Sequence, residues 1–384
     1  MRINQVLVGG LLSVLAVWPA AAQRAGGETV AEPFKLGTFE IDGRAEVGIV
    51  LRDRFVVELD EANAALELDP FYVEIPMPDD MLALIGRYEY GMKRRLYEIV
   101  DFVVASGALD GPSRPAYVHD VETLRTLPPI MYPGKILNAA VNFYSHVNET
   151  GTPEEIAEAR RQRRENRGVP YLFLKPSRGA VIGHGDAVKI PYGRDRTDWE
   201  VELATVIGRP AKYVSAADAR DYIFGYMISL DISDRGGRPP GGAPFATDWF
   251  VGKGHDTFAP QGPWMVPKEF YGDPMERLHQ TLTVDGVLMQ EARAGDMIHS
   301  LYELIEYASS IITLFPGDVI NNGTSGGVGM GTAVRGEQRF LQDGEVITAT
   351  IEGIGTLRVP VVAEDAPPQG TGSQLPPVDS YRGP

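Results

Sequence analysis

The chain has 384 residues, 36 basic and 52 acidic side chains, a formal net charge of −16 and no cysteine. Its content of 43% hydrophobic and 23% charged residues is that of a globular protein, which excludes a wholly disordered or fibrous chain. The lack of cysteine excludes a disulfide framework, an iron–sulfur cluster and a thiol nucleophile. The acidic balance argues against nucleic acid as a partner, because phosphate binding needs clustered basic residues.

Residues 1–22 have the pattern of a secretory signal peptide. Arg2 supplies a positive charge, residues 6–18 form an apolar run, and three alanines at 20–22 suit signal peptidase. A transmembrane anchor is the alternative, but the run is shorter than the roughly 20 apolar residues that span a bilayer. We therefore expect cleavage before Gln23, a secreted or periplasmic protein, and no membrane span in the mature chain.

Residues 30–125 are predicted to form a smaller N-terminal α/β extension. The period-two patterns over 34–60 are typical of β-hairpins. Farther along, an apolar stripe within 78–105 indicates a helix, and Asp79 or Asp80 could cap its start.

Residues 135–362 are predicted to form a mixed, β-rich α+β catalytic domain, because short apolar runs alternate with Gly, Pro and Asp. Two helices interrupt the strands. One is charged and solvated, lies within 152–166 and has a threonine cap. The other is apolar, covers 298–314 and would be capped by Asp296. A polar, flexible tail over 364–384 would follow.

Two acidic residues stand on the predicted strand 198–207. Glu200 and Glu202 point to the same face, because side chains alternate along a strand. Either this face is solvated, or the strand is buried, as its apolar residues suggest, and the two charges need compensation. A hard divalent cation such as Mg²⁺, Mn²⁺ or Ca²⁺ provides it through oxygen ligands. Asp231, central in the apolar strand 226–233, would complete a three-carboxylate metal site.

His146 and Glu149 form a candidate acid–base pair just after a predicted strand at 136–141. They would meet within one helical turn, where the carboxylate orients the ring and raises its basicity. The imidazole could then activate water. A surface histidine beside a glutamate is the simpler interpretation of this pair on its own.

The run Gly323-Thr324-Ser325-Gly326-Gly327 formally matches the Gly-x-Ser-x-Gly elbow of serine hydrolases. In the α/β-hydrolase fold the histidine follows the serine, but all six histidines precede Ser325, so the triad cannot close. We interpret the loop instead as a carboxylate-binding element, in which backbone amides and the Thr324 hydroxyl act as donors.

Taken in order, these motifs resemble those of the fumarylacetoacetate hydrolase family. The matching stretches cover about 135–361 and include Asn142-Phe143-Tyr144-Ser145-His146-Val147-Asn148-Glu149, Phe173-Leu174-Lys175-Pro176-Ser177, the 198–204 run, Leu230-Asp231-Ile232-Ser233, Gly252-Lys253-Gly254-His255-Asp256-Thr257-Phe258, Pro316-Gly317-Asp318-Val319-Ile320 and Ile351-Glu352-Gly353-Ile354-Gly355. The resemblance implies a compact β roll, usually a homodimer, with a divalent ion at its centre.

The resemblance also assigns roles to individual residues. By position it implies metal ligands at Glu200, Glu202 and Asp231, catalytic residues at His146, Glu149 and Lys253, and substrate-binding residues at Lys175, Arg235 and Thr324. The implied reaction is the hydrolysis of a carbon–carbon bond in a β-diketo acid such as an acylpyruvate. The small keto acid is then the protein's partner, and Mg²⁺, Mn²⁺ or Ca²⁺ its cofactor.

The chain departs from the family pattern after Asp231, because Arg238 stands where a substrate-binding glutamine is usual. Two alternatives therefore stay open. One keeps the ion and performs enol–keto isomerisation or decarboxylation of a related dicarboxylic acid. The other is a secreted protein that binds a carboxylated ligand without turnover. The His146–Glu149 pair favours water activation, and hence hydrolysis.

Overall fold

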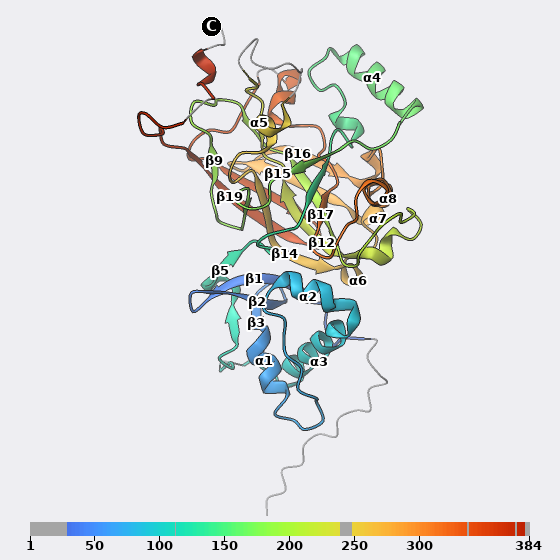
Figure 1. The fold of residues 1–384 in the computed structure, drawn as a ribbon, viewed down its shortest axis with the longest axis vertical. Coiled ribbons are helices and arrows are strands. Elements are labelled where there is room, and N and C mark those ends of the chain that lie inside the picture. Colours follow the sequence, from blue (N-terminus) through green and yellow to red (C-terminus); the bar gives the residue numbers. More distant parts are fainter. Residues whose placement is uncertain (1–28, 112, 239–247, 336–337, 373–374, 381–384) are drawn as a thin grey trace, which may run out of the picture.

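The computed structural model describes residues 29–111, 113–238, 248–335, 338–372 and 375–380. The predicted signal peptide, 1–22, lies outside the described residues. Within the described ranges no helix is long and apolar enough to cross a membrane. The molecule is elongated, with a smaller N-terminal module at one end and a larger body at the other (Figure 1).

The N-terminal module is a curved sheet covered by three helices. It contains β1 (Lys35–Ile41), β2 (Arg44–Leu51), β3 (Phe55–Glu58), α1 (Leu59–Leu66), α2 (Met81–Arg87), α3 (Met92–Ala105), β4 (Val118–Asp120) and β5 (Arg125–Leu127). The predicted hairpin pattern is present, since β1 pairs with β2 and β2 with β3, each antiparallel. The helix expected over 78–105 is divided, because Gly91 has φ 114° and ends a short 3-10 turn before α3 begins. Asp80 caps α2, as its side chain accepts a hydrogen bond from the Ala83 amide.

The body contains most of the strands and the remaining helices. Its elements are β6 (Ile136–Ala139), α4 (Pro153–Glu165), β7 (Leu172–Lys175), β8 (Val181–Ile182), β9 (Val188–Ile190), β10 (Thr197–Asp198), β11 (Val201–Ile207), β12 (Ile223–Leu230), β13 (Ser233–Asp234), α5 (Trp249–Lys253), β14 (Ala259–Pro267), α6 (Lys268–Tyr271), α7 (Pro274–Arg277), β15 (His279–Val284), β16 (Val287–Arg293), α8 (Leu301–Ile311), β17 (Val319–Asn321), β18 (Val346–Ile351) and β19 (Gly355–Ala363). The expected β-rich α+β fold is thus confirmed.

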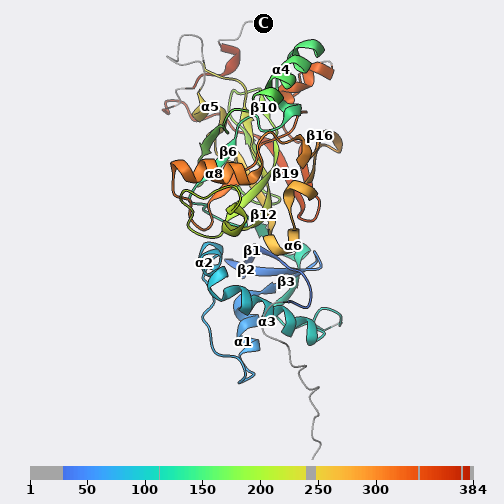
Figure 2. The ribbon, with the colours of Figure 1, turned by 90° about the vertical axis from the view of Figure 1, so that its right-hand side faces the viewer.

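Two large sheets organise the chain. The first has the order β4-β3-β2-β1-β14-β12-β11-β17-β6-β7 and runs from the N-terminal module through the body, and the second has the order β16-β15-β18-β19-β9. A hydrophobic core between them contains Trp199, Tyr226, Leu282 and Leu357. Figure 2 shows the module's sheet and helices stacked along the long axis below the body. A second core joins the module's side chains to those of β11, β12 and β14 in the body.

The predicted N-cap of helix α8, Asp296, is wrong. It begins at Leu301, and Ser300 caps it through reciprocal hydrogen bonds with Glu303. Asp296 instead accepts a hydrogen bond from the Ser145 amide, 3.0 Å away. By contrast, α4 has the expected threonine cap.

One described residue near the end of the chain packs against the body. Val378, within the predicted flexible tail, is buried, and its amide donates to the Gly193 carbonyl at 2.8 Å. This hydrogen bond and the burial of Val378 attach this position to the body, and the flexibility of 364–384 stays a prediction.

Candidate active site

Three carboxylates converge where β11 begins and β12 ends. These strands are antiparallel, with Val201 opposite Leu230, so Asp231 lies beside Glu200 and its amide donates to the Glu200 carbonyl at 3.0 Å. Glu202 lies two residues into the same run. One oxygen from each of the three carboxylates lies within 4.8 Å of the others. All three residues are buried, so the alternative of a solvated face does not apply.

Two lysines neutralise part of this cluster. Lys253 Nζ lies 2.9 Å from Glu200 Oε2 and 2.6 Å from Asp231 Oδ2. The fully buried Lys175 Nζ lies 2.5 Å from Asp231 Oδ1. Burial lowers the pKa of Lys175 to about 8, although Asp231 acts in the opposite direction. Both lysines therefore contact the predicted metal ligands directly, which the sequence pattern did not reveal.

Arg235 adds a third cation. It contacts Glu200 and also lies 3.0 Å from Asp198 Oδ2, through Nε. Asp198, which the sequence reasoning did not single out, is completely buried and accepts hydrogen bonds from the amides of Gly329 and Met330. Burial disfavours ionisation of Glu200, but Lys253 and Arg235 outweigh it and lower its pKa.

Glu202 is the carboxylate with the least compensation. Among the described residues it forms no ion pair, and its Oε2 accepts a hydrogen bond from the Gly323 amide at 2.6 Å. Burial and the nearby charges of Asp231 and Glu200 raise its pKa well above the ordinary value. With Asp198, four carboxylates thus face three cations. This excess negative charge and the purely oxygen donor set fit a hard divalent cation.

His146 and Glu149 meet as the sequence predicts. A 3-10 turn, Tyr144–His146, brings the Nδ1 atom of His146 into contact with the Glu149 Oε1 atom. The Glu149 Oε2 atom accepts a hydrogen bond from the Gly327 amide at 2.7 Å. The side chains are only 14% and 10% exposed, so the pair is not an ordinary surface contact.

The segment that carries His146 is fixed from three sides through Ser145. The Ser145 amide donates to Asp296, its hydroxyl accepts from the Gly326 amide, and its carbonyl accepts from Arg160 of α4. Helix α4 and the glycine-rich loop therefore hold the histidine in place. Sequence reasoning missed Asp296 in this role.

Thr324 lies in the pocket, but its hydroxyl is already engaged. It donates to the Val201 carbonyl at 2.9 Å and accepts from Gln290 Nε2 at 2.8 Å. Its proposed contact with a substrate carboxylate stays a prediction. The neighbouring Ser325 is buried, and its hydroxyl has no hydrogen-bond partner among the described residues.

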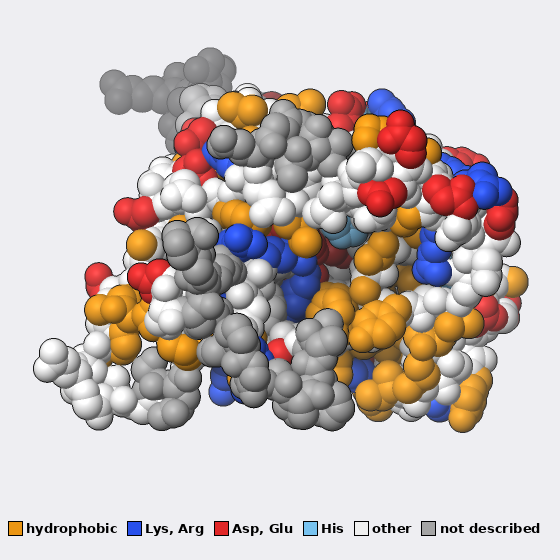
Figure 3. Space-filling model, turned by 90° about the horizontal axis from the view of Figure 1, so that it is seen from above, with side chains coloured by type: hydrophobic (Ala, Val, Ile, Leu, Met, Phe, Trp, Pro, Cys, Tyr) orange, Lys and Arg blue, Asp and Glu red, His pale blue; other side chains and the backbone are white. Residues whose placement is uncertain are grey.

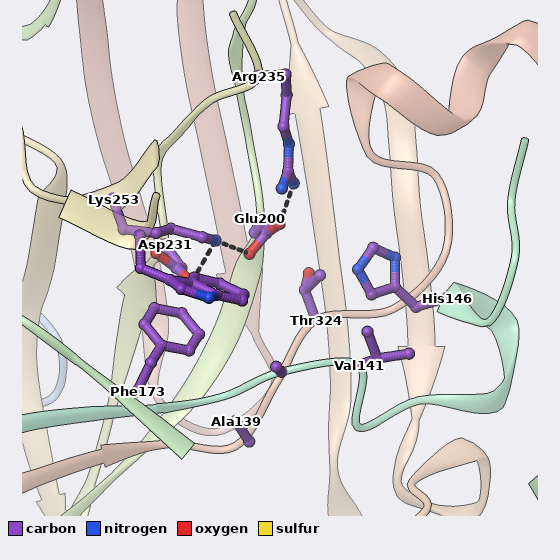
Figure 4. Close-up of a pocket in the computed structure, with 11 residues that line it drawn as sticks. Ala139, Val141, His146, Phe173, Glu200, Asp231, Arg235, Lys253 and Thr324 are labelled. Atoms are coloured by element: carbon purple, nitrogen blue, oxygen red, sulfur yellow. Dashed lines mark hydrogen bonds and ion pairs between the residues drawn. The ribbon is translucent and has the colours of Figure 1, made fainter. Parts of the chain in front are cut away.

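A pocket of about 70 Å³ unites these groups. Its described lining combines charged and apolar side chains, namely Ala139, Ala140, Val141, His146, Phe173, Glu200, Asp231, Arg235, Trp249, Lys253 and Thr324. Figure 4 shows His146 and Val141 on one side, Lys253 and Phe173 on the other, and Glu200 and Thr324 between them. Viewed from above, basic side chains line a hollow with hydrophobic side chains beside it (Figure 3).

Two residues near the pocket do not line it. Arg238, which replaces the usual glutamine, donates to Asp248 Oδ2 at 2.6 Å. His255 Nε2 lies 3.5 Å from Asp234 Oδ2, and Asp234 is also paired with the buried Arg194. Arg238 therefore forms a salt bridge with Asp248 and is not among the described residues that line the pocket.

The fold and the pocket define a class of protein, a β-rich catalytic body with a buried carboxylate centre and an adjacent histidine–carboxylate pair. The family model for the fumarylacetoacetate (FAA) hydrolase C-terminal domain matches residues 135–362. The chain therefore belongs to the fumarylacetoacetate hydrolase family. An uncharacterized protein of Pyrococcus abyssi is 42% identical over 239 residues, which cover 61% of this chain and 92% of that protein.

Solved structures with different activities resemble this chain. Fumarylacetoacetate hydrolase from Exiguobacterium antarcticum is 26% identical, with a TM-score of 0.63, and the match covers 86% of this chain and all (100%) of that chain. Maleylpyruvate hydrolase from Sphingobium sp. SYK-6, in complex with manganese(II) ion and pyruvate, is 28% identical, with a TM-score of 0.60 and coverage of 86% and 100%. The 2-hydroxyhepta-2,4-diene-1,7-dioate isomerase from Mycobacterium marinum is 27% identical, with a TM-score of 0.58 and coverage of 87% and 100%. These findings support a metal-dependent hydrolase or isomerase.

Proposed function

We propose that this protein is a divalent-metal-dependent hydrolase that cleaves a carbon–carbon bond in a β-diketo acid. The observation that carries the proposal is the His146–Glu149 pair, which faces the buried carboxylates across one pocket (Figure 4). Isomerisation and decarboxylation consume no water, whereas a histidine oriented by a carboxylate is suited to activating one.

Glu200, Glu202 and Asp231 would hold the ion. When bound, a divalent cation would supply Lewis acidity and positive charge for the 2-keto acid end of the substrate. Mg²⁺, Mn²⁺ and Ca²⁺ all accept this oxygen donor set. Support comes from the excess negative charge of the site and from the manganese bound to the related maleylpyruvate hydrolase.

The chain's own residues would perform the proton chemistry. His146 takes a proton from water while the hydroxide adds to the carbonyl carbon distal to the acid. The bond from that carbon to the methylene carbon then breaks, and its electron pair leaves as an enolate. Lys253 stabilises the enolate oxygen, and a proton finally reaches the methylene carbon. Arg235, Lys175 and Thr324 would orient the substrate or the groups that touch it.

The decisive experiment follows the loss of diketo-enol absorbance for a series of acylpyruvates, with Mg²⁺, with Mn²⁺ and with EDTA. Hydrolysis predicts equimolar pyruvate and carboxylic acid, and no activity with EDTA. A single product that contains every carbon of the substrate would favour the isomerase alternative. The related dioate isomerase supports this alternative. Release of carbon dioxide would favour decarboxylation, and tight binding without any product would favour a carboxylate-binding protein.

We further propose a secreted or periplasmic homodimer. The signal-peptide pattern of residues 1–22 supports the location, and family resemblance supports the dimer. N-terminal sequencing of protein from the culture medium or periplasm should begin at Gln23, and an intact Met1 would contradict cleavage. Light scattering during gel filtration should give twice the mass of one chain, and a monomer mass would contradict the dimer.

A further inference from the structure

Much of the pocket's described lining is apolar. The apolar residues are Ala139, Ala140 and Val141, together with Phe173 and Trp249 on the side of Lys253. The rings of Phe173 and Trp249 stack with their centroids 4.5 Å apart, and Lys253 Nζ lies 5.2 Å from the centroid of Phe173, so this aromatic pair lies beside the keto-acid end of the site. A surface of this kind gains affinity by removing apolar groups from water and offers no charge to a second carboxylate.

The cations that do line the pocket are already engaged. Lys253 bridges Glu200 and Asp231, and Arg235 bridges Glu200 and Asp198. The described lining contains no other lysine or arginine. The cluster has one more carboxylate than it has cations, so a divalent ion would leave a single positive charge. That charge matches one substrate carboxylate, and burying a second would be costly.

Val141 provides an independent observation. Its φ is 49°, a left-handed conformation that is a genuine outlier for a β-branched residue. The side chain is 43% exposed, so core packing does not account for it. The next residue locks the turn, because the Asn142 side chain donates to the carbonyls of His299 and Asn322 and accepts from the His299 amide. Strain that the surroundings enforce is a feature of ligand-contacting segments.

We infer that the pocket selects a keto acid with a single carboxylate and an apolar substituent at the other end. This inference rests on the proposed function. Val141 lies on the same side of the pocket as His146 (Figure 4), so the substituent next to the attacked carbonyl would contact Val141. Dicarboxylic keto acids would leave their second charge against an apolar wall.

Binding of three unreactive oxamates tests the inference independently of turnover. Calorimetry on the Mn²⁺-loaded protein would compare oxamate, N-phenyloxamate and N-oxalylglycine, which share the keto-acid-like end. We expect N-phenyloxamate to bind at least about tenfold more tightly than the dicarboxylate N-oxalylglycine. Equal or tighter binding of N-oxalylglycine, with oxamate still bound, would overturn this inference alone. Failure of all three to bind would overturn the proposed function as well.

A matched pair of variants tests whether Val141 determines the preference for N-phenyloxamate over N-oxalylglycine. Val141→Lys should reverse the preference, by about tenfold in favour of N-oxalylglycine, because it places a cation on the apolar wall. Val287→Lys adds the same charge at an exposed position on β16 and should leave the preference unchanged. Val141→Ala, a milder change, should weaken only the binding of N-phenyloxamate. Wild-type preference in folded Val141→Lys and Val141→Ala proteins, checked by thermal unfolding, would refute the role of Val141.

Discussion

Lys253 and Asp231 form a buried ion pair, with Nζ 2.6 Å from Oδ2, on a carboxylate that is also a candidate metal ligand. The ammonium and a divalent cation therefore compete for the same negative charge. Lys253→Met should tighten Mg²⁺ binding by about tenfold, because it removes a neighbouring positive charge. Calorimetric titration measures this, with the exposed Lys212→Met as control. Weaker binding in Lys253→Met would show that the lysine supports the ion.

Glu202→Gln should have the opposite effect on the ion. A neutral amide oxygen carries no negative charge and is a weaker ligand than a carboxylate, so Mg²⁺ affinity should fall by at least about 100-fold. The metal-free protein should become more stable by about 1–3 kcal/mol, because the buried site raises the pKa of the Glu202 carboxyl and so disfavours its ionised form, a cost that a neutral amide does not carry. Thermal unfolding with and without Mg²⁺ reports both effects. A variant that Mg²⁺ still stabilises as it does the wild type would remove Glu202 from the site.

His146→Ala separates catalysis from metal binding. Its imidazole contacts Glu149 and forms no hydrogen bond or ion pair with the described side chains of Glu200, Glu202 and Asp231, so Mg²⁺ affinity should stay near the wild-type value. Turnover of an acylpyruvate should fall by about 10²-fold or more, the usual effect of losing a general base. Steady-state kinetics beside calorimetry gives both quantities. Unchanged turnover would mean that another group activates the water.

Acid stability should depend on Glu269 in α6. Its carboxylate accepts hydrogen bonds from the hydroxyls of Tyr88 and Tyr97 and pairs with Lys93, all in the N-terminal module. Burial opposes ionisation, but Lys93 and the hydrogen bonds prevail and lower its pKa below 4.5. Its stabilising contribution is therefore present above the unfolded-state pKa and is lost as the pH falls through the folded-state value.

Glu269→Gln should accordingly lower the free energy of unfolding at neutral pH by about 1–3 kcal/mol. The difference from wild type should shrink in acid, where the wild-type carboxyl is also neutral. Urea denaturation at a series of pH values measures this dependence. A difference that is constant across the whole range would contradict the role of the charge.

Val141→Asn should stabilise the fold. Asparagine tolerates the left-handed conformation better than valine does, and relief of this strain is worth about 1 kcal/mol. The same variant should bind N-phenyloxamate more weakly. Urea denaturation gives the stability, and Val287→Asn, in a regular strand, should bring no gain. A less stable Val141→Asn protein would indicate that the valine side chain contributes to packing.

The clustering of the three carboxylates and the contact of His146 with Glu149 could be predicted from the sequence, because both depend largely on local rules. Alternation along one strand places Glu200 and Glu202 on one face, and a single helical turn brings His146 to Glu149. The pairing of β11 with β12 brings Asp231 beside the two glutamates. This pairing is not a local property of the sequence, and the resemblance to the family is what predicts it.

Other features depend on contacts between distant segments, which composition and periodicity do not encode. Phe173 and Trp249 are far apart in sequence, and only the fold makes them stack. Asp296 was assigned to a helix cap because it precedes an apolar run. The Ser300 and Glu303 spacing of a capping box was present in the sequence and is the signal that identifies the true start of α8.

The pairing of β1 with β14, at Leu36 opposite Met265, has a practical consequence for expression design. Deleting the first 134 residues would uncover one edge of β14 and the side chains of β11 and β12 that share a core with the module. The truncated protein would expose the unpaired backbone groups of an edge strand, and we expect it to aggregate. We therefore expect the module and the body to fold together, although the family's signature occupies only the latter part of the chain.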